Sequence, residues 1–321
     1  MAGRFTPRTP GTGSISPPRP AGHTRVWTLP GPLDLALTLG PLRRGPADPT
    51  YRTTPDGAVW RASRTPDGPA TLRVTARDGA AHAEAWGPGA AWMLGQLPAM
   101  LGELDDPAAF EPRHRLVAET HRARPGLRLT RTGLVLESLI PSVLEQKVTT
   151  DEAYRAWRLL VRTYGEPAPG APGGMYVMPA PRTWALIPSW EWHRAGVDSK
   201  RSATILRAVR VARRMEEAAK MTPRAAAERL HLIPGIGPWT SAETLQRAIG
   251  AADLVTVGDL HLPGIIGHAL AGNRNADDAE MLALLEPYAG HRHRAARLIL
   301  LSGRTPPRRA PRMQPRNIAP L

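Results

Sequence analysis

The sequence predicts an α+β fold in which a small antiparallel sheet precedes an all-helical domain. Before residue 90, apolar residues alternate with polar ones or form short runs separated by turn sequences, which is typical of strands. Beyond Asp105, apolar stripes recur with the 3.6-residue period of helices. The chain has 321 residues, of which 42% are hydrophobic, and this is enough to bury a substantial core in about two domains.

Four strands are expected in the N-terminal part, at residues 33–39, 59–62, 71–74 and 81–86. Pro66-Asp67-Gly68 and Asp78-Gly79 are turn sequences between the last three strands, which should therefore form an antiparallel meander. A helix is expected at 90–101, although Pro98 lies inside it. We predict that residues 24–104 form one small α+β domain.

The rest of the ordered chain is expected to be helical. A Pro/Gly-rich loop at 166–178 interrupts the pattern. We predict a helical domain at 105–302 and disordered basic tails at 1–23 and 303–321, because both tails are rich in Pro and Arg and lack apolar periodicity. The expected helices are 134–148, 153–164, 184–195, 200–219, 223–230, 241–249, 261–270, 276–285 and 291–301.

The charge balance favours a polyanionic partner. The formal net charge is +14, and all the basic residues except Lys147, Lys200 and Lys220 are arginines, whose planar guanidinium suits phosphates and base edges. Nucleic acid is therefore the first hypothesis for the partner. The alternative is that the charge only aids solubility.

Several classes of site are excluded or unexpected. The chain has no cysteine, which rules out disulfides, a thiolate nucleophile and cysteine-ligated metal centres. His291 and His293 have no acidic partners nearby in sequence, so we expect no catalytic metal and no cofactor. No apolar run is long enough to span a membrane, and the N-terminus lacks the apolar core of a signal peptide. We expect a cytoplasmic protein, at the nucleoid if it is bacterial.

The most informative segment is a glycine-containing turn, LIPGIGPWTS at 232–241, between two helical patterns. Gly235 and Gly237 let the backbone approach a ligand closely, and the amides that begin the next helix point at one anion. We therefore predict that Gly235, Ile236, Gly237 and Thr240 bind a DNA phosphate. An isolated Gly-x-Gly would more often be a simple turn, but the longer string is more specific.

A second loop, VTVGDLHLP at 255–263, places Asp259 before an apolar helical pattern. On local physics alone such an aspartate is an N-cap. At this distance after the hairpin, however, the loop resembles that of the helix-hairpin-helix base-excision DNA glycosylases. The resemblance implies that Asp259 is the catalytic aspartate, and it covers about residues 105–301. A carboxylate there would stabilise the positive charge that builds on the sugar and would orient or deprotonate water.

Trp239 bears on the type of reaction. Family members that also cleave the DNA backbone carry a Schiff-base lysine where this chain has Trp239, so the resemblance implies a monofunctional glycosylase without lyase activity. A tryptophan at this place is similar to the 3-methyladenine branch, where aromatic walls stack on cationic alkylated purines. Tyr288 is the candidate for a second wall of the base pocket. Glu243 is expected in the same pocket, one helical turn after Trp239, where that branch can carry another aromatic residue. Packing of Trp239 in the core is the alternative.

The segment at 136–149 (LESLIPSVLEQKVT) resembles the helix whose tip fills the gap left by a flipped base. Gln146 and Lys147 occupy the wedge position, where a side chain offsets the cost of extruding a base. Lys147 is less apolar than the usual wedge and instead suits a phosphate contact. The alternative is a solvated helix end.

Three functions remain open. The first is a glycosylase for alkylated purines in base excision repair, acting as a monomer on damaged double-stranded DNA. The second is a glycosylase for another lesion, such as an oxidised purine or uracil. The third is a non-catalytic helix-hairpin-helix DNA-binding protein. The resemblance also implies that a monovalent cation sits on the hairpin carbonyls.

Overall fold

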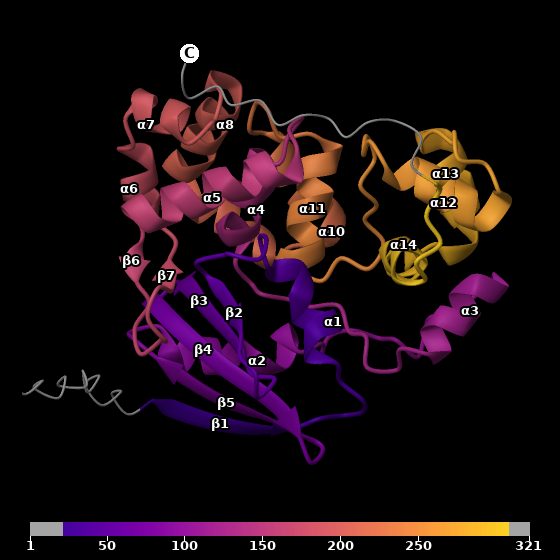
Figure 1. Ribbon diagram of the computed structural model, residues 1–321, viewed down its shortest axis with the longest axis horizontal. Helices are drawn as coiled ribbons and strands as arrows, with labels where there is room; N and C mark the ends of the chain where they lie inside the picture. Colours follow the sequence, from indigo (N-terminus) through magenta and orange to yellow (C-terminus); the bar gives the residue numbers. More distant parts are fainter. Residues whose placement is uncertain (1–21, 308–321) are drawn as a thin grey trace, which may run out of the picture.

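The computed structural model describes residues 22–307, and within them a five-stranded sheet lies beside a larger set of helices (Figure 1). The sheet is antiparallel, with the strand order β1-β5-β4-β3-β2. Its strands are β1 (His23–Thr28), β2 (Tyr51–Thr53), β3 (Val59–Thr65), β4 (Gly68–Arg77) and β5 (Ala80–Trp86). The predicted α+β class is therefore confirmed. Most of the two predicted tails, at 1–21 and 308–321, lies outside the described residues, whereas His23 already belongs to β1.

The predicted meander is present as β3, β4 and β5. Asp78 and Gly79 join the last two strands with φ angles of 52° and 72°, the left-handed conformation that a tight two-residue hairpin turn requires. β1 and β2, which the sequence pattern did not indicate, extend this meander on its two sides.

The strand predicted at 33–39 is wrong, because this segment forms helix α1 (Leu35–Leu39) followed by a short 3₁₀ turn, η1 (Gly40–Leu42). The side chain of Asp34 caps the helix by accepting a hydrogen bond from the Leu37 amide. The alternating leucines have a different cause: Leu35 and Leu39 pack against the sheet core, while Leu37 packs against the C-terminal helices. The alternation thus reflects two cores and not two faces of a strand.

The two faces of the sheet have different neighbours. The predicted helix is confirmed as α2 (Ala90–Met100), with Pro98 inside it. It packs on one face of the sheet, against Leu72 and Val74 of β4. On the other face Trp60 stacks on Trp86, with ring centroids 5.4 Å apart. These rings join a core with the small hairpin of β6 (Glu166–Pro167) and β7 (Tyr176–Val177). The sheet is thereby fastened to the helical part.

The helical part differs from its prediction in two respects. The hairpin β6-β7 means that it is not all-helical. Two predicted helices are also each divided: 184–195 breaks before Pro188, and 200–219 breaks at Val211. The observed helices are α3 (Arg115–Arg122), α4 (Val135–Leu144), α5 (Thr150–Tyr164), α6 (Pro181–Ala185), α7 (Ser189–Arg194), α8 (Ser199–Arg210), α9 (Ala212–Glu216), η2 (Glu217–Lys220), α10 (Pro223–His231), α11 (Pro238–Ala248), α12 (Leu262–Ala271), α13 (Asp278–Leu285), η3 (Glu286–Tyr288) and α14 (Arg292–Leu301).

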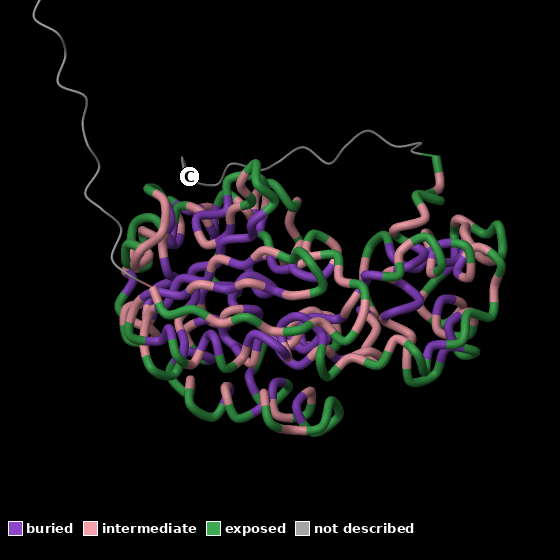
Figure 2. The backbone as a smooth tube through the Cα atoms, turned by 90° about the horizontal axis from the view of Figure 1, so that it is seen from below, coloured by how far each residue is buried: buried purple, intermediate pink, exposed green. Residues whose placement is uncertain are grey.

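The helices enclose two cores, and buried segments gather accordingly in a larger and a smaller group (Figure 2). The larger core is formed by α4 to α11. The smaller belongs to what we call the C-terminal lobe, formed by α3, α12, α13 and α14. Helix α3 precedes α4 in sequence and yet packs against α14. The domain boundaries predicted at 104 and 105 stay a prediction. No helix among the described residues combines the length and apolarity needed to cross a membrane.

Candidate functional site

The glycine-containing turn joins α10 to α11 and is held by its isoleucines. Ile233 and Ile236 are buried in the larger core, and the Ile236 amide donates to the Ile233 carbonyl. Gly235 has a φ of 100°, and a Cβ there would lie 2.1 Å from Thr204 Oγ1. Only glycine meets both requirements. Ile236 therefore anchors the turn, and its amide is not available to a phosphate.

The start of α11 keeps its amide donors. Within residues 22–307, no acceptor is paired with the backbone amide of Gly235, Gly237 or Trp239. These amides and the helix dipole make the N-terminus of this eleven-residue helix attractive to an anion. Thr240, in contrast, is 2% exposed and turns its hydroxyl inward.

The tip of α4 meets the hairpin directly. The side-chain amide of Gln146 donates to the Gly235 carbonyl at 2.9 Å and to Thr240 Oγ1 at 2.8 Å. Gln146 thus braces the hairpin. The next residue, Lys147, is exposed and has a φ of 55°, so it is Lys147 that stands outermost at the tip.

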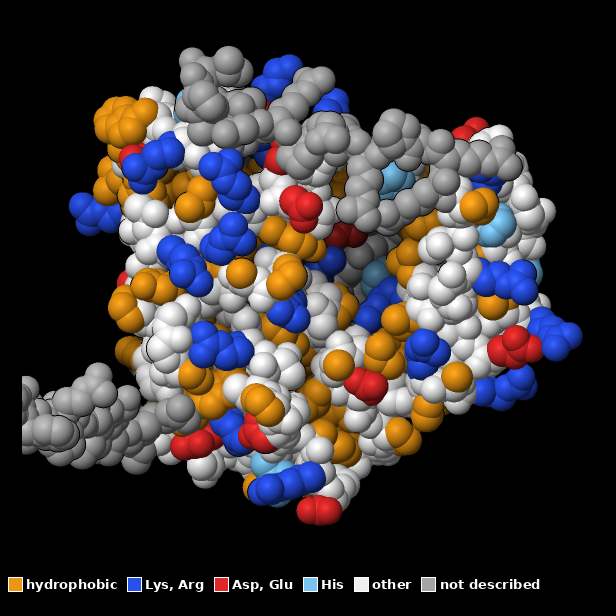
Figure 3. All heavy atoms as spheres, in the orientation of Figure 1, with side chains coloured by type: hydrophobic (Ala, Val, Ile, Leu, Met, Phe, Trp, Pro, Cys, Tyr) orange, Lys and Arg blue, Asp and Glu red, His pale blue; other side chains and the backbone are white. Residues whose placement is uncertain are grey.

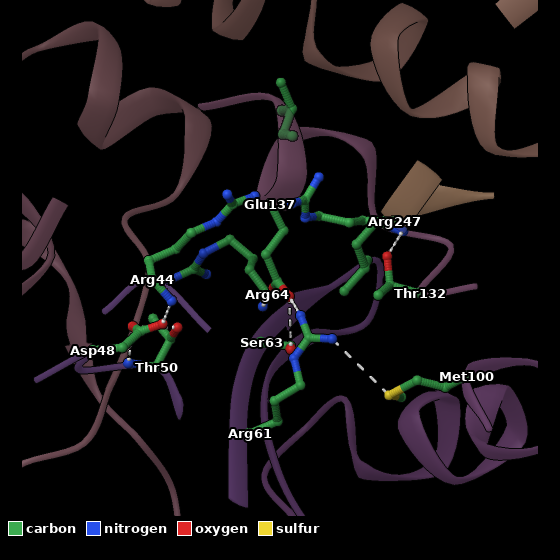
Figure 4. A network of polar contacts seen from close by, with 12 residues as sticks. Arg44, Asp48, Thr50, Arg61, Ser63, Arg64, Met100, Thr132, Glu137 and Arg247 are labelled. Carbon is green, nitrogen blue, oxygen red and sulfur yellow. Dashed lines mark hydrogen bonds and ion pairs between the residues drawn. The ribbon is translucent and has the colours of Figure 1, made fainter. Parts of the chain in front are cut away.

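Buried arginines fix this tip from two other sides. Arg201 of α8 is 4% exposed and donates to the Leu144 carbonyl at 2.8 Å. Arg44, which follows η1, pairs with Glu145 at 2.9 Å. Figure 4 shows that Arg44 belongs to a larger network in which Glu137 of α4 points toward Arg61 of β3. The N-terminal part of the chain therefore supports the helix that precedes Lys147.

Asp259 lies beside Trp239 and at the start of α12. Its Oδ1 accepts hydrogen bonds from the amides of His261 at 2.8 Å and Leu262 at 2.9 Å. Its Oδ2 accepts the indole N–H of Trp239 at 3.0 Å. The N-cap of α12 is His261 and not Asp259, but the two backbone amides at the start of α12 orient the Asp259 carboxylate without covering it, since Asp259 remains partly exposed.

Asp259 also lines a cleft of about 390 Å³. The walls come from α11, from the loop that carries Asp259, from α12 and α14, and from Pro41 of η1. The surface is hollowed here between the larger helical core and the C-terminal lobe (Figure 3). A volume of this size is within the range of small-molecule sites and accommodates a purine.

The structure brings only some of the predicted base-pocket residues to this cleft. Glu243 lines it and pairs with Arg247 at 2.7 Å. Trp239 touches Asp259 but is not part of the lining. Tyr288 lies elsewhere: it is 3% exposed, stacks on Phe110, and its hydroxyl is 2.7 Å from the ring nitrogen of His114. Burial in the C-terminal lobe explains why Tyr288 does not reach the cleft.

Among the lining residues that the sequence did not indicate, Arg247, His293 and Arg297 carry basic side chains. Burial, followed by the nearby guanidinium of Arg297, holds the pKa of His293 well below its usual 6.5, so its imidazole is neutral at pH 7. Burial, and then Arg247, lowers the pKa of Arg297 to about 10, so Arg297 stays charged. The signal was the i, i+4 spacing of 293 and 297, which places both on one face of α14.

No cluster of three or more potential metal ligands occurs among His, Asp and Glu of residues 22–307. In the hairpin, the carbonyls of Ile233, Pro234 and Gly235 accept hydrogen bonds from Ile236, Arg207 and Gln146 respectively. These oxygens are thus already supplied with donors from the protein, and the monovalent cation on hairpin carbonyls stays a prediction.

No family model matches the chain, and no curated protein matches it. Solved structures do. A 3-methyladenine DNA-glycosylase from Archaeoglobus fulgidus is 16% identical, with a TM-score of 0.70 over 87% of this chain and 98% of that one. An 8-oxoguanine glycosylase/lyase from Clostridium acetobutylicum is 10% identical, with a TM-score of 0.67 over 87% and 98%. MBOgg1, solved with a low-affinity DNA ligand, is 14% identical, with a TM-score of 0.69 over 88% and 95%.

At these identities the likeness concerns the fold alone. It covers the sheet as well as the helices, because each match spans more than four fifths of the chain. The neighbours differ in the lesion that they are named for, so the likeness does not choose among lesions. The chain has the fold of the helix-hairpin-helix DNA glycosylases.

Proposed function

We propose that this protein is a monofunctional DNA glycosylase, which hydrolyses the N-glycosidic bond of a base flipped out of duplex DNA. The observation that carries the proposal is the position of Asp259. This carboxylate is fixed by three hydrogen bonds at the wall of a purine-sized cleft, one hydrogen bond away from the first turn of the hairpin helix α11. A hairpin that binds phosphate would place the reacting sugar near this carboxylate.

The contacts of Asp259 suit hydrolysis. As the glycosidic bond breaks, positive charge builds on the sugar, and a fixed anion stabilises it without having to reorganise. The two backbone amides occupy Oδ1, whereas Oδ2 accepts a single donor, the indole of Trp239. Oδ2 therefore retains a lone pair with which to orient or deprotonate water.

The proposal of a monofunctional enzyme rests on the lysines. A lyase of this family needs an amine that attacks the sugar, and Trp239 stands at the expected position. Lys147 follows Gln146, which contacts the hairpin, and is therefore the lysine that we test as an alternative nucleophile. We expect borohydride to trap no covalent adduct between the protein and DNA. If an adduct forms and disappears in Lys147→Arg, the enzyme is a lyase that uses Lys147.

Alkylated purines are the lesion that the sequence favours, through the aromatic character of Trp239. The prediction of alkylated purines also assigned Tyr288 to a second aromatic wall of the base pocket. Tyr288 is buried outside the cleft. The alkylated-purine assignment stays a prediction.

The test is base release by Asp259→Asn from duplexes that carry single lesions. We expect the rate constant to fall roughly 10²- to 10⁴-fold, because the charge is lost while the shape is kept. DNA affinity should stay within about twofold. Asp67→Asn, in the exposed β3-β4 turn, is the matched control and should behave as the unmodified protein. If the unmodified protein binds DNA but releases no base from any duplex, the non-catalytic binding role replaces this proposal.

A further inference from the structure

The cleft beside Asp259 lacks aromatic walls. Its sixteen lining residues include no Phe, Tyr or Trp. Recognition of a cationic alkylated purine through the face of such a ring is therefore not available inside the cleft. Instead, α11 and α14 direct polar and basic groups toward the same space, chiefly Arg247, His293 and Arg297.

Arg297 is the group with the most unused donors. One terminal nitrogen donates to the Leu37 carbonyl at 2.6 Å, which fixes the side chain against the N-terminal part of the chain. Within residues 22–307 no acceptor is paired with its other two nitrogens, and no carboxylate forms an ion pair with it. A guanidinium held in this way presents a fixed fork of N–H groups to whatever enters the cleft.

Arg247 adds one further donor group. Its Nε donates to the Pro41 carbonyl at 2.9 Å, and one terminal nitrogen donates to Glu243 at 2.7 Å. The remaining nitrogen has no partner among the described residues. Since Glu243 is committed to Arg247, Asp259 is the carboxylate in the lining without a cationic partner. The lining thus combines the partly unused donors of Arg247 and Arg297 with one carboxylate that has no cationic partner, Asp259.

The unused donors of Arg247 and Arg297 bear on the charge and the polar groups of the base that the cleft can accept. Glu243 balances the charge of Arg247, so a cationic base would meet the guanidinium of Arg297, which no described carboxylate pairs and whose repulsion is strengthened by the low dielectric. A carbonyl oxygen, in contrast, accepts the N–H groups of Arg247 and Arg297 that no described residue binds. The neutral imidazole of His293 adds a hydrogen-bonding edge without adding charge.

We propose that the cleft receives an uncharged base with an exocyclic carbonyl oxygen, such as an oxidised or deaminated base, held by Arg247 and Arg297. This inference rests on the proposed glycosylase function and names its substrate class. Normal guanine and thymine also carry carbonyl oxygens, but they pair and stack well, so they are more costly to extrude than a mispaired or damaged base.

The experiment uses the full chain and a panel of duplexes that separates charge from carbonyl groups. Hypoxanthine, uracil and 8-oxoguanine are uncharged and carry carbonyl oxygens. 1,N⁶-Ethenoadenine is uncharged without a carbonyl, and 3-methyladenine is cationic without one. Release of each base is followed by chromatography. We expect at least one carbonyl-bearing base to be released at least about tenfold faster than the last two.

Arg297→Met removes the donor fork while keeping much of the side-chain volume. We expect it to slow release of the carbonyl-bearing base roughly 10- to 100-fold and to abolish the preference over ethenoadenine. Arg297→Lys keeps the charge and should restore part of the rate, which a purely structural role would not predict. Arg115→Met, on the exposed face of α3, is the matched control. The thermal midpoint of each variant checks that it is folded.

The outcomes separate this inference from the proposed function. If 3-methyladenine or ethenoadenine is released as fast as every carbonyl-bearing base, the protein is a glycosylase and the substrate inference is wrong. If no base is released, the proposed function fails. Binding of duplexes with non-hydrolysable 2′-fluoro lesion nucleosides then decides the inference: Arg297-dependent preference for carbonyl lesions supports it, and equal binding of all duplexes overturns it.

Discussion

At the scale of single residues, the hydrogen bond from Trp239 is one of three that hold the carboxylate of Asp259 in one orientation. The indole N–H reaches Oδ2 from the first turn of α11, while two backbone amides at the start of α12 hold Oδ1. Each hydrogen bond to a charged group is worth about 1.5–3 kcal/mol. Trp239 thus holds the carboxylate of Asp259 in place, a contact that differs from the stacking role that its residue type indicated.

Trp239→Phe tests this role because it keeps a ring and removes the N–H. We expect the rate constant for base release to fall roughly 10- to 100-fold with KM unchanged, since the carboxylate loses one of its three anchors. Single-turnover kinetics measure both quantities. Trp190→Phe, at an exposed ring of α7, should have no effect. A rise in KM alone would show instead that Trp239 contacts the base.

Gly235→Ala probes the hairpin. At a φ of 100° an alanine is strained, and its Cβ would meet Thr204 Oγ1 at 2.1 Å. We expect a loss of about 1–3 kcal/mol in the free energy of unfolding, measured by denaturant titration. Gly237→Ala, where φ is −109° and the space is open, should cost less than about 1 kcal/mol. Equal losses at the two glycines would contradict the role of Thr204.

At the scale of elements, α4 is held so that its tip faces outward next to the hairpin. The end of the helix is fixed by the hydrogen bond from Arg201 to Leu144, by the ion pair of Arg44 with Glu145 and by the hydrogen bond from Gln146 to the hairpin. Lys147 follows in a left-handed conformation. A non-glycine residue in that conformation costs about 1–2 kcal/mol. Retaining a strained lysine at the most exposed point of the element is consistent with a role in contacting DNA.

Lys147→Gly should therefore change stability and binding in opposite directions. We expect the free energy of unfolding to rise by up to about 1 kcal/mol, because the strain is relieved and the entropy of glycine offsets part of the gain. DNA affinity should fall, and the slope of log K against log salt should drop by about 1. Lys220→Gly, at an exposed position of η2, tests whether any lysine has this effect. Unchanged binding would assign DNA contact to other residues.

At the scale of the whole molecule, buried ion pairs join the sheet to the helices. Glu137 of α4 pairs with Arg61 of β3 and accepts a hydrogen bond from Ser63 at 3.1 Å, all of it buried or nearly so (Figure 4). Arg44 and Glu145 form a second pair across the same boundary. The N-terminal sheet is in this way part of the support of the candidate site.

Glu137→Ala would leave Arg61 charged, buried and unpaired. We expect the free energy of unfolding to fall by about 3–5 kcal/mol, measured by thermal and denaturant unfolding. Glu228→Ala removes an exposed pair with Arg224 and should cost less than about 1 kcal/mol. A small effect of Glu137→Ala would mean that water or another carboxylate replaces it.

The local parts of this molecule were predictable because local rules decide them. Turn residues and β-alternation indicated β3 to β5, and helical periodicity indicated α4, α5 and α10 to α14. Where the same sequence pattern fits both a strand and a helix, local rules do not predict the secondary structure. Leu35, Leu37 and Leu39 alternate as a strand would, but the Asp34 cap and two separate cores make a helix of them.

Sequence by itself determined the α+β class and the hairpin, because each depends on residues close together in the chain, whereas the catalytic role of Asp259 stays a prediction. Tertiary structure alone decided the cleft, which joins Pro41, Arg247, Asp259 and Arg297 from four distant segments. The tertiary structure also buries Tyr288 in the C-terminal lobe and brings Trp239 into contact with Asp259. Side chains far apart in sequence meet only when the cores are packed, and packing, unlike periodicity, cannot be read from spacing along one chain.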